Sequence, residues 1–278
     1  MKPKTNVFVV FWLIGMISSL LVLLYVNKIV GIIGLVFFNI LILYVLYKYS
    51  FLIVIHSHKY GLLNKKFFES KSKGYMNEDN RWKIARKTII ELVNPKKGEK
   101  ILDIACGYGF SSIECAVKGA DVTSLDISKT ALEWTKRIGK KKGVNLKIIE
   151  SDAVSLKGVE EKNFDKAIYA NITEHLLNED TLKSFKNCNK ILKDKGYVFI
   201  YCPNGNHYSE YIRLKPIEGH IGLKSMEELV DLLEKADFDI VKKYYKPGAV
   251  PILKELDILF QDYIPIFRKR LCIVARKR

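Results

Sequence analysis

A short stretch with nucleotide-binding residue types, ILDIACGYGF, lies at residues 101–110 of the chain. An apolar segment there reaches Asp103, and two glycines, Gly107 and Gly109, follow it. Glycines in such a turn let backbone N–H groups approach a ligand, and the next helix presents its positive end to negative charge. Asp126 ends the next apolar segment, where a carboxylate can accept hydrogen bonds from ribose hydroxyls. The spacing therefore predicts a nucleotide-binding loop.

The elements that must position this loop follow from the apolar pattern after about residue 64. Apolar runs typical of buried strands alternate with segments of helical spacing, which predicts a parallel sheet with helices on both faces. A last pair of strands lacks a normal crossover and predicts an antiparallel end to the sheet. The expected fold is a Rossmann-like, doubly wound α/β sheet of seven strands. The predicted strands are 100–104, 121–126, 146–150, 164–170, 197–202, 239–245 and 271–275, and the predicted helices are 81–93, 111–117, 129–141, 177–191 and 226–236.

Several residues help to distinguish between nucleotides. The dinucleotide fingerprint G-x-G-x-x-G would require a glycine at Ser112, and Asp103 would repel a pyrophosphate. A cationic ligand with an amine would instead be attracted. Asp152 and Ala153, after the third strand, can present an acceptor and an N–H to an adenine. An NAD-dependent oxidoreductase of the membrane surface remains an alternative, as does a non-catalytic anchored module of the same fold.

These motifs, in this order and spacing, resemble those of the class I S-adenosylmethionine-dependent methyltransferases, including relatives that methylate quinone precursors and other small acceptors. The resemblance covers about residues 81–278. It rests on LDIACGYG, VTSLDIS, SDA, FDKAIYANITEHL and LKDKGYVFIYCPN. Ala105 departs from the pattern, because the family most often has glycine there.

The resemblance implies S-adenosyl-L-methionine as the cofactor. Its methionine part would lie among Asp103 and the backbone of the loop, its ribose on Asp126, its adenine on Ile127 and Asp152, and its sulfonium near Asn171. Each carboxylate can instead cap a helix or face solvent. The predicted cofactor-binding residues are Asp103, Ala105, Gly107, Gly109, Asp126, Ile127, Asp152, Ala153 and Asn171.

Two histidines are candidates for acid–base work, since transfer to a hydroxyl needs a group that removes its proton. His175, in the family-like stretch TEHL, is the first candidate for a base or an acceptor-orienting group, and His220 is the second. Glu174 either orients His175 or is a charge at a helix start. Either histidine can instead simply cap or pack a helix. No metal site is expected, because His56 and His58 have no further ligands near them and the five cysteines form no CxxC pair.

The N-terminal part is strongly apolar. Val7–Val26 and Ile29–Tyr47 are each long enough for a bilayer span, and the lysines flanking them predict a hairpin with both ends in the cytoplasm. The sequence thus predicts a multi-pass membrane protein with two spans and a cytoplasmic catalytic domain. The expected parts are a transmembrane hairpin at 1–55, an interfacial or lid segment at 56–80 and a methyltransferase domain at 81–278.

The formal charge of +16 fits either a lysine-rich surface or attraction to anionic lipids. No arginine-rich or aromatic-interleaved motif points to RNA, so no nucleic-acid partner is expected. The expected function is methyl transfer to a small or lipid-linked acceptor at the cytoplasmic membrane surface. Residues 246–270 form either an amphipathic flap over that acceptor or an extra core helix. Protein methylation stays open.

Overall fold

The computed structural model describes residues 80–160, 163–212, 219–248 and 251–278, and in addition Gly15, Ile17, Ser18, Gly34, Val36, Phe37, Asn39, Ile40, Leu41 and Glu69. Backbone contacts divide the chain into two units, Met1–Leu62 and Leu63–Arg278. The predicted boundaries at residues 55 and 80 remain predictions. The fold described below belongs to the second unit.

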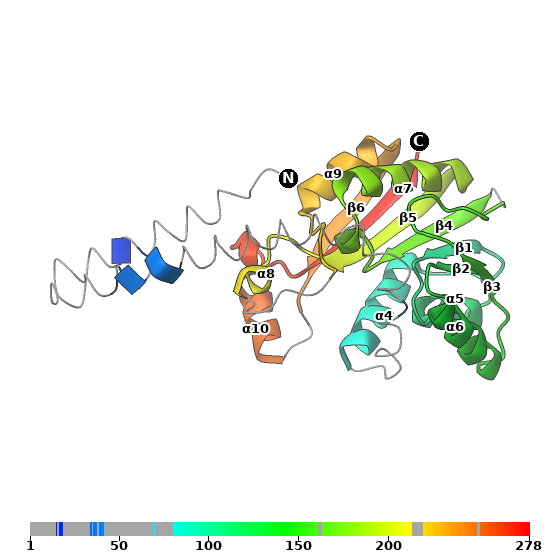
Figure 1. Ribbon diagram of the computed structural model, residues 1–278, viewed down its shortest axis with the longest axis horizontal. Coiled ribbons are helices and arrows are strands. Elements are labelled where there is room, and N and C mark those ends of the chain that lie inside the picture. Colours follow the sequence, from blue (N-terminus) through cyan, green and yellow to red (C-terminus); the bar gives the residue numbers. More distant parts are fainter. Residues whose placement is uncertain are drawn as a thin grey trace. The chain divides into compact units, whose positions relative to one another are not determined.

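A seven-stranded sheet forms the centre of the second unit, in the order β3-β2-β1-β4-β5-β7-β6 (Figure 1). β1 to β5 run parallel, and β7 is antiparallel to both of its neighbours. The strands are β1 (Lys100–Ile104), β2 (Asp121–Asp126), β3 (Lys147–Glu150), β4 (Phe164–Ala170), β5 (Leu192–Pro203), β6 (Phe238–Lys246) and β7 (Arg270–Lys277).

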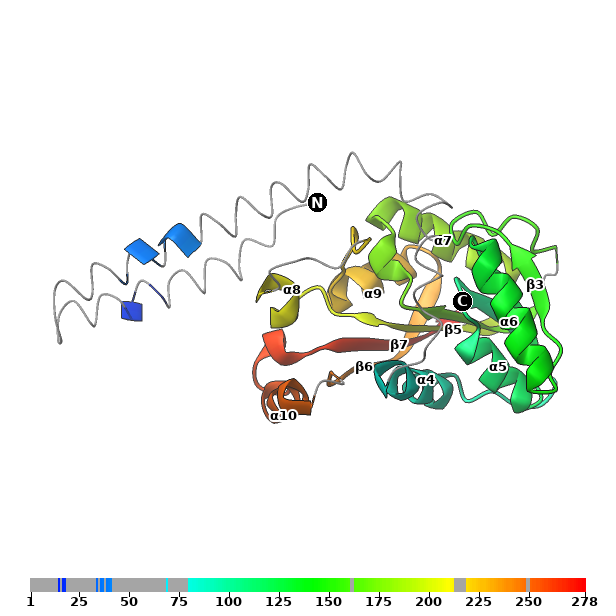
Figure 2. The same ribbon diagram turned by 60° about the horizontal axis from the view of Figure 1, so that its bottom comes forward.

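Helices cover both faces of the sheet. In Figures 1 and 2, α4, α5 and α6 lie on one face and α7 and α9 on the other, while α8 and α10 lie beyond the ends of the strands. The α-helices are α4 (Asn80–Val93), α5 (Phe110–Val117), α6 (Lys129–Lys141), α7 (Asn178–Ile191), α8 (Tyr208–Ile212), α9 (Met226–Glu234) and α10 (Pro251–Phe260), and the short 3₁₀ turns are η2 (Thr173–His175) and η3 (Pro265–Phe267).

Alternating side chains along each strand build two apolar cores. Ile101 packs with Ile89 and Ile113 on the side of α4 and α5, while its neighbour Leu102 packs with Phe185 on the side of α7 and α9. Because successive side chains point to opposite faces of a sheet, a near-continuous apolar strand such as β1 buries both of its faces. Burial on both sides fixes the strand register and thereby the positions of the loops at the strand ends.

The predicted fold is confirmed in its main features. β1, β2, β4 and α6 begin and end at the expected residues, and the sheet has seven strands with the last one antiparallel. β7 lies between β5 and β6 rather than beyond them, and α10 and η3 occupy the chain between β6 and β7. The segment 246–270 is therefore mainly a helical connection between β6 and β7 at one end of the sheet.

The prediction of a multi-pass membrane protein requires correction. Most residues of the two predicted spans, and nearly all of the segment 56–80, lie outside the described residues. A span needs one continuous apolar helix of about 20 residues, since the bilayer core is about 30 Å thick. Among the residues that the structure does describe, no helix is long and apolar enough to cross a membrane. This finding overturns the predicted localisation, which rested on the length of the two apolar runs and on the lysines that flank them.

Candidate active site

The site lies at the edge of the sheet where the parallel strands end. β1 is flanked by β2 on one side and by β4 on the other, so the order of the strands reverses there. Ligands of open α/β sheets bind at such a switch point, outside the carboxyl ends of the strands. The loop after β1 and the residue after β4, Asn171, meet at this position and line one pocket.

The glycine loop has the backbone geometry that its sequence predicts. Gly107 and Gly109 both adopt positive φ angles, 55° and 67°. A Cβ on Gly109 would lie 2.3 Å from the Thr135 side chain, so α6 packs directly against the loop there. Ala105 also has a positive φ of 57°, a conformation that costs a residue with a Cβ about 1 kcal/mol. This conformation gives a physical reason for glycine at the corresponding position in similar sequences.

Asp103 is a buried carboxyl group that lines the pocket. The Ser112 hydroxyl donates a hydrogen bond of 2.6 Å to its Oδ2. Burial raises the pKa of Asp103 to about 7, and the nearby Asp126 adds to the rise. No cation pairs with Asp103 among the described residues, so an ammonium group bound in the pocket would meet an acceptor of opposite charge.

Asp126, at the end of β2, ties the glycine loop to the start of α6. Its Oδ2 accepts a hydrogen bond from the Gly107 N–H at 2.8 Å, and its Oδ1 accepts one from the Ser128 N–H at 2.8 Å. Burial raises the pKa of Asp126 above its ordinary value. The carboxylate therefore shapes the loop, and its predicted contact with a ribose remains a prediction.

Glu69, in the predicted lid segment, contacts the start of α6 beside this loop. Its carboxylate accepts hydrogen bonds from the Ser128 hydroxyl at 2.8 Å and from the Thr130 N–H at 3.0 Å. Both donors are at the start of α6, where unpaired N–H groups and the helix dipole favour negative charge. A point in the chain before α4 therefore contacts the site beside Asp126.

Asp152 has local partners after β3. Its Oδ1 accepts hydrogen bonds from the N–H groups of Val154 and Ser155, and its Oδ2 accepts one from the Ser155 hydroxyl. Partial burial opposes ionisation, but these hydrogen bonds outweigh it and lower the pKa of Asp152. Asp152 thus caps a turn, while its contact with an adenine, like those of Ile127 and Ala153, stays a prediction.

An open pocket with a cavity volume of about 60 Å³ joins these parts. Asp103 and Ala105 lie on one side of it and Asn171 on another. The sequence interpretation missed the contribution of α4, whose Arg86 and Ile89 face the pocket; the helical spacing of its apolar residues was the only signal. The lining residues are Ala85, Arg86, Ile89, Asp103, Ala105, Cys106, Phe110, Ser111, Ala170 and Asn171.

The two candidate histidines come together, although neither is among the residues that line the pocket. The rings of His175 and His220 lie 5.1 Å apart and nearly perpendicular to each other. The Nδ1 of His175 lies 2.8 Å from the Gly219 carbonyl oxygen. Since a carbonyl can only accept, Nδ1 carries the proton and Nε2 carries none in the neutral ring. The imidazole is therefore oriented with its basic nitrogen at Nε2.

Glu174 is buried next to His175, and burial raises its pKa above the ordinary value. Within the described part of the chain, its Oε2 has no hydrogen-bond partner. Ligand atoms of Glu174, His175 and His220 lie within 4.8 Å of one another, a set that could hold a metal ion. The sequence predicted no metal site, and that prediction stays untested. The Gly219 carbonyl orients the His175 ring, and an orienting role of Glu174 stays a prediction.

Lys224 holds this cluster together, although its sequence context gave no sign of it. The side chain is buried, and its ammonium group donates to the carbonyl oxygens of Thr173, Leu176 and Gly222 at 2.8, 2.7 and 2.7 Å. The first two belong to η2 and the residue after it, and the third to the segment that carries His220. All three donors of the lysine are satisfied by the backbone.

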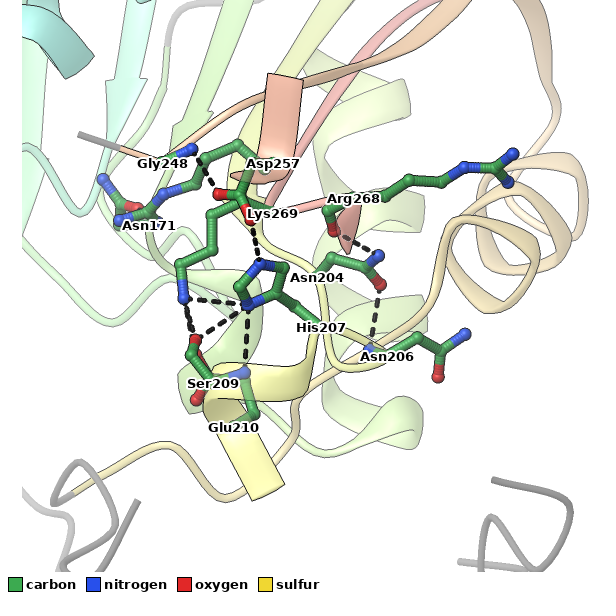
Figure 3. Close-up of polar contacts among 11 residues, drawn as sticks. Asn171, Asn204, Asn206, His207, Ser209, Glu210, Gly248, Asp257, Arg268 and Lys269 are labelled. Carbon is green, nitrogen blue, oxygen red and sulfur yellow. Dashed lines mark hydrogen bonds and ion pairs between the residues drawn. The ribbon is translucent and has the colours of Figure 1, made fainter. Parts of the chain in front are cut away.

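A second buried polar cluster anchors α10 at the same edge of the sheet. Figure 3 shows His207 between Asp257 of α10 and Ser209 of α8, with distances of 2.9 Å from Nε2 to Oδ1 and 2.8 Å from Nδ1 to Oγ. The Ser209 N–H donates to Nδ1, so the proton of the neutral ring is on Nε2 and points at Asp257. Asp257 also accepts from the Gly248 N–H at 2.9 Å. The helix between β6 and β7 is thus fastened to the end of β5.

The fold and the site define a class of protein. The pocket fits the amine-bearing, cationic cofactor predicted from the sequence, because Asp103 supplies a buried carboxylate without a counter-cation among the described residues. Residues 101–196 match the family model described as a methyltransferase domain. Residues 101–196 thus belong to an S-adenosylmethionine-dependent methyltransferase domain, and the cofactor is S-adenosylmethionine.

Individual relatives agree with this assignment. The chain is 28% identical over 169 residues to a ubiquinone biosynthesis O-methyltransferase of Aliivibrio fischeri. The alignment covers 61% of this chain and 66% of that relative, so the chain spans just under two thirds of the relative's length. Among solved structures, a protein of Pyrococcus horikoshii matches with a TM-score of 0.56 and 19% identity over 72% of this chain and 93% of its own. A phosphoethanolamine N-methyltransferase of Haemonchus contortus, crystallised with S-adenosylhomocysteine, matches with a TM-score of 0.53 and 21% identity over 69% and 52%. These two structures share the fold.

Proposed function

We propose that the protein transfers the methyl group of S-adenosylmethionine to a hydroxyl oxygen of a small-molecule acceptor, either free or joined to a lipid tail. The observation that carries the proposal is the orientation of His175, whose Nδ1–H is directed at the Gly219 carbonyl. A histidine held in this way presents an unprotonated Nε2, which is what removal of a hydroxyl proton requires. The relatives named as O-methyltransferases support an oxygen acceptor.

The residues around the pocket have distinct tasks in this proposal. Asp103 binds the ammonium group of the cofactor, and the left-handed turns at Ala105 and Gly107 bring the backbone close to it. When bound, S-adenosylmethionine supplies a methyl group on a positively charged sulfur. Asn171, which lines the pocket after β4, lies near the sulfonium in this proposal.

His175 acts on the acceptor. Its Nε2 accepts the hydroxyl proton as the oxygen–methyl bond forms, so that the acceptor gains a methyl group and loses one proton. The nearby Glu174 is buried, which raises its pKa, and a positive charge on the His175 ring would favour its ionised form. His220 packs against the His175 ring and restricts its rotation.

The test is an assay of the full-length protein with methyl-labelled S-adenosylmethionine and catechol, followed by separation of labelled small molecules, lipid and protein. The informative variant is His175→Asn, because the asparagine amide can still donate to the Gly219 carbonyl while the basic nitrogen is absent. The expected loss in kcat is about 100-fold, with unchanged affinity for S-adenosylhomocysteine. A variant that keeps full kcat would remove His175 from the proposed role, and label found only in protein would refute the small-molecule acceptor.

A further inference from the structure

Arg270 occupies a central position at the catalytic edge of the sheet. It is the first residue of β7, and its register partners are Pro203, which ends β5, and Lys246, which ends β6. Since β7 is antiparallel, it begins where the parallel strands end. The side chain of Arg270 is therefore placed at the same edge as the cofactor pocket and the histidines.

Two contacts fix the guanidinium of Arg270. Its Nη1 donates a hydrogen bond of 2.9 Å to the Oδ1 of Asn171, a residue that lines the pocket. Its central carbon lies 5.5 Å from the centre of the Tyr201 ring. An amide on one side and an aromatic ring on the other hold a planar cation in a defined orientation. The guanidinium thus stands at the boundary of the cofactor pocket.

The positive charge of Arg270 has no direct counter-charge in the described part of the chain. No carboxylate there lies within 4.0 Å of it, and Asn171 is the only side chain that accepts a hydrogen bond from it. The adjacent Lys269, by contrast, has Glu210 at 3.5 Å. A guanidinium has five N–H donors, so most of those of Arg270 remain for another partner.

Other positively charged residues lie close to Arg270 along the chain and in the sheet register. Lys246 is the register partner of Arg270 on β6, and Lys269 precedes it in the chain, so cations gather at this point of the edge. Glu174 is a buried acid at this edge; burial raises its pKa, and the charges of His175 and Arg270 oppose that rise. Arg270 is therefore close enough to Glu174, the chain neighbour of the proposed base, for their charges to interact.

We infer that Arg270 binds an oxyanion, a carboxylate or phosphate group, of the methyl acceptor and so aims the acceptor hydroxyl at His175. The inference rests on the proposed function and adds the chemical class of its substrate. An arginine fork matches two oxygens of a carboxylate or phosphate at once, which fixes direction as well as distance. The hydrogen bond to Asn171 and the packing on the Tyr201 ring hold the guanidinium of Arg270 in place before the acceptor binds. Binding therefore costs little side-chain entropy.

The test measures binding of three probes to the full-length protein saturated with S-adenosylhomocysteine. Benzoate carries a carboxylate, phenyl phosphate carries a phosphate, and benzamide is a neutral analogue of the first. We expect benzoate or phenyl phosphate to bind at least about tenfold more tightly than benzamide, and the preferred one identifies the oxyanion. Equal binding of all three probes, or binding of none, would overturn the inference.

The variants Arg270→Met and Arg270→Lys assign the effect to this residue. The methionine variant should lose the preference for the anion, and the lysine variant should retain part of it because it keeps the charge without the fork. Arg276→Met, an exposed arginine near the other end of β7, is the matched control and should bind like the wild type. If Arg270 served only to hold Asn171, its replacement would weaken the binding of S-adenosylhomocysteine. The preference among the three probes would then stay unchanged.

Failure of this inference can be told apart from failure of the proposed function. Tight binding of S-adenosylhomocysteine with label transfer to catechol, but no anion preference, rejects the role of Arg270 alone. Absence of label transfer to any hydroxyl compound rejects the proposed function, whatever the probes show.

Discussion

The Nζ of Lys224 lies 2.7 Å from the carbonyl oxygen of Leu176, and the same ammonium group reaches the carbonyls of Thr173 and Gly222. One buried cation thereby fastens the turn that carries Glu174 and His175 to the segment that carries His220. A Cβ on Gly222 would lie 1.8 Å from the Leu176 oxygen, so the two segments are as close as backbones can come. Lys224 is a positioning residue in this arrangement, because it touches neither the pocket nor the reacting atoms.

Replacing Lys224 by methionine should therefore impair both stability and catalysis. Three buried carbonyl groups would lose their donor, and the expected loss in the free energy of unfolding is about 3 kcal/mol, measured by denaturant titration. Among molecules that remain folded, kcat should fall more than the affinity for S-adenosylhomocysteine. Lys235→Met, at an exposed position on the helix end, is the control and should change stability by less than about 0.5 kcal/mol. Unchanged kcat in the folded Lys224 variant would contradict the positioning role.

The two glycines of the loop should respond very differently to the same change. A Cβ on Gly109 would collide with Thr135 at 2.3 Å, whereas a Cβ on Gly107 would meet nothing within 4 Å. Both have a positive φ, so each alanine variant carries about 1 kcal/mol of backbone strain. Only Gly109→Ala should also displace α6. This variant should lose binding of S-adenosylhomocysteine, which titration calorimetry measures. Similar binding by both variants would show that the close contact with Thr135 does not shape the site.

Affinity for the cofactor should depend on pH through Asp103. Its pKa in the free protein is about 7, because burial opposes its ionisation, and a bound ammonium group requires the ionised form. Below pH 7 the carboxyl group must first lose its proton, so the affinity should fall by up to about tenfold per pH unit. Above pH 7 this dependence should disappear. Titration calorimetry with S-adenosylhomocysteine checks this, and Asp103→Asn should bind weakly at every pH.

Stability should fall in mild acid because of His207. Burial lowers its pKa to about 4, and the neighbouring Lys269 adds to the shift. An unfolded histidine takes up a proton near pH 6.5, whereas the folded one resists it until about pH 4. Between these values the unfolded state binds more protons, so the free energy of unfolding should decrease as the pH falls. Asp257 favours the protonated ring, while Arg270 and Lys269 oppose it.

Hydrogen exchange shows where this loss of stability arises. Because His207 fastens Asp257, the amides of α10 should lose protection in that pH range before those of β1. A uniform loss of protection over both elements would mean that His207 does not act as a local anchor.

The sequence predicts the sheet well because β1, β2 and β4 are buried on both faces and are read directly as apolar runs. It also predicts that Asp103 and Asn171 come together, since the ends of parallel strands share one edge, and both line the pocket. The sequence did not predict that His175 and His220 meet, because their contact depends on how the chain folds back after β5.

Other parts of the site depend on tertiary contacts that no local pattern encodes. Lys224 and Arg270 read as ordinary surface cations, yet one is buried among carbonyl groups and the other stands beside Asn171. Asp152 shows the converse, because the carboxylate predicted to bind adenine also caps its own turn. Hydropathy alone predicted two membrane spans, and the described residues contain no such helix.

The most direct measurement is carbon NMR of the products formed from catechol and S-adenosylmethionine labelled with ¹³C in its methyl group. With the wild-type protein we expect the label in a methoxy group on the catechol oxygen, and about 100-fold less of it with His175→Asn at equal occupancy by the cofactor. Label on nitrogen or in the protein itself, or a His175→Asn variant as active as the wild type, would contradict methyl transfer to a hydroxyl assisted by this histidine.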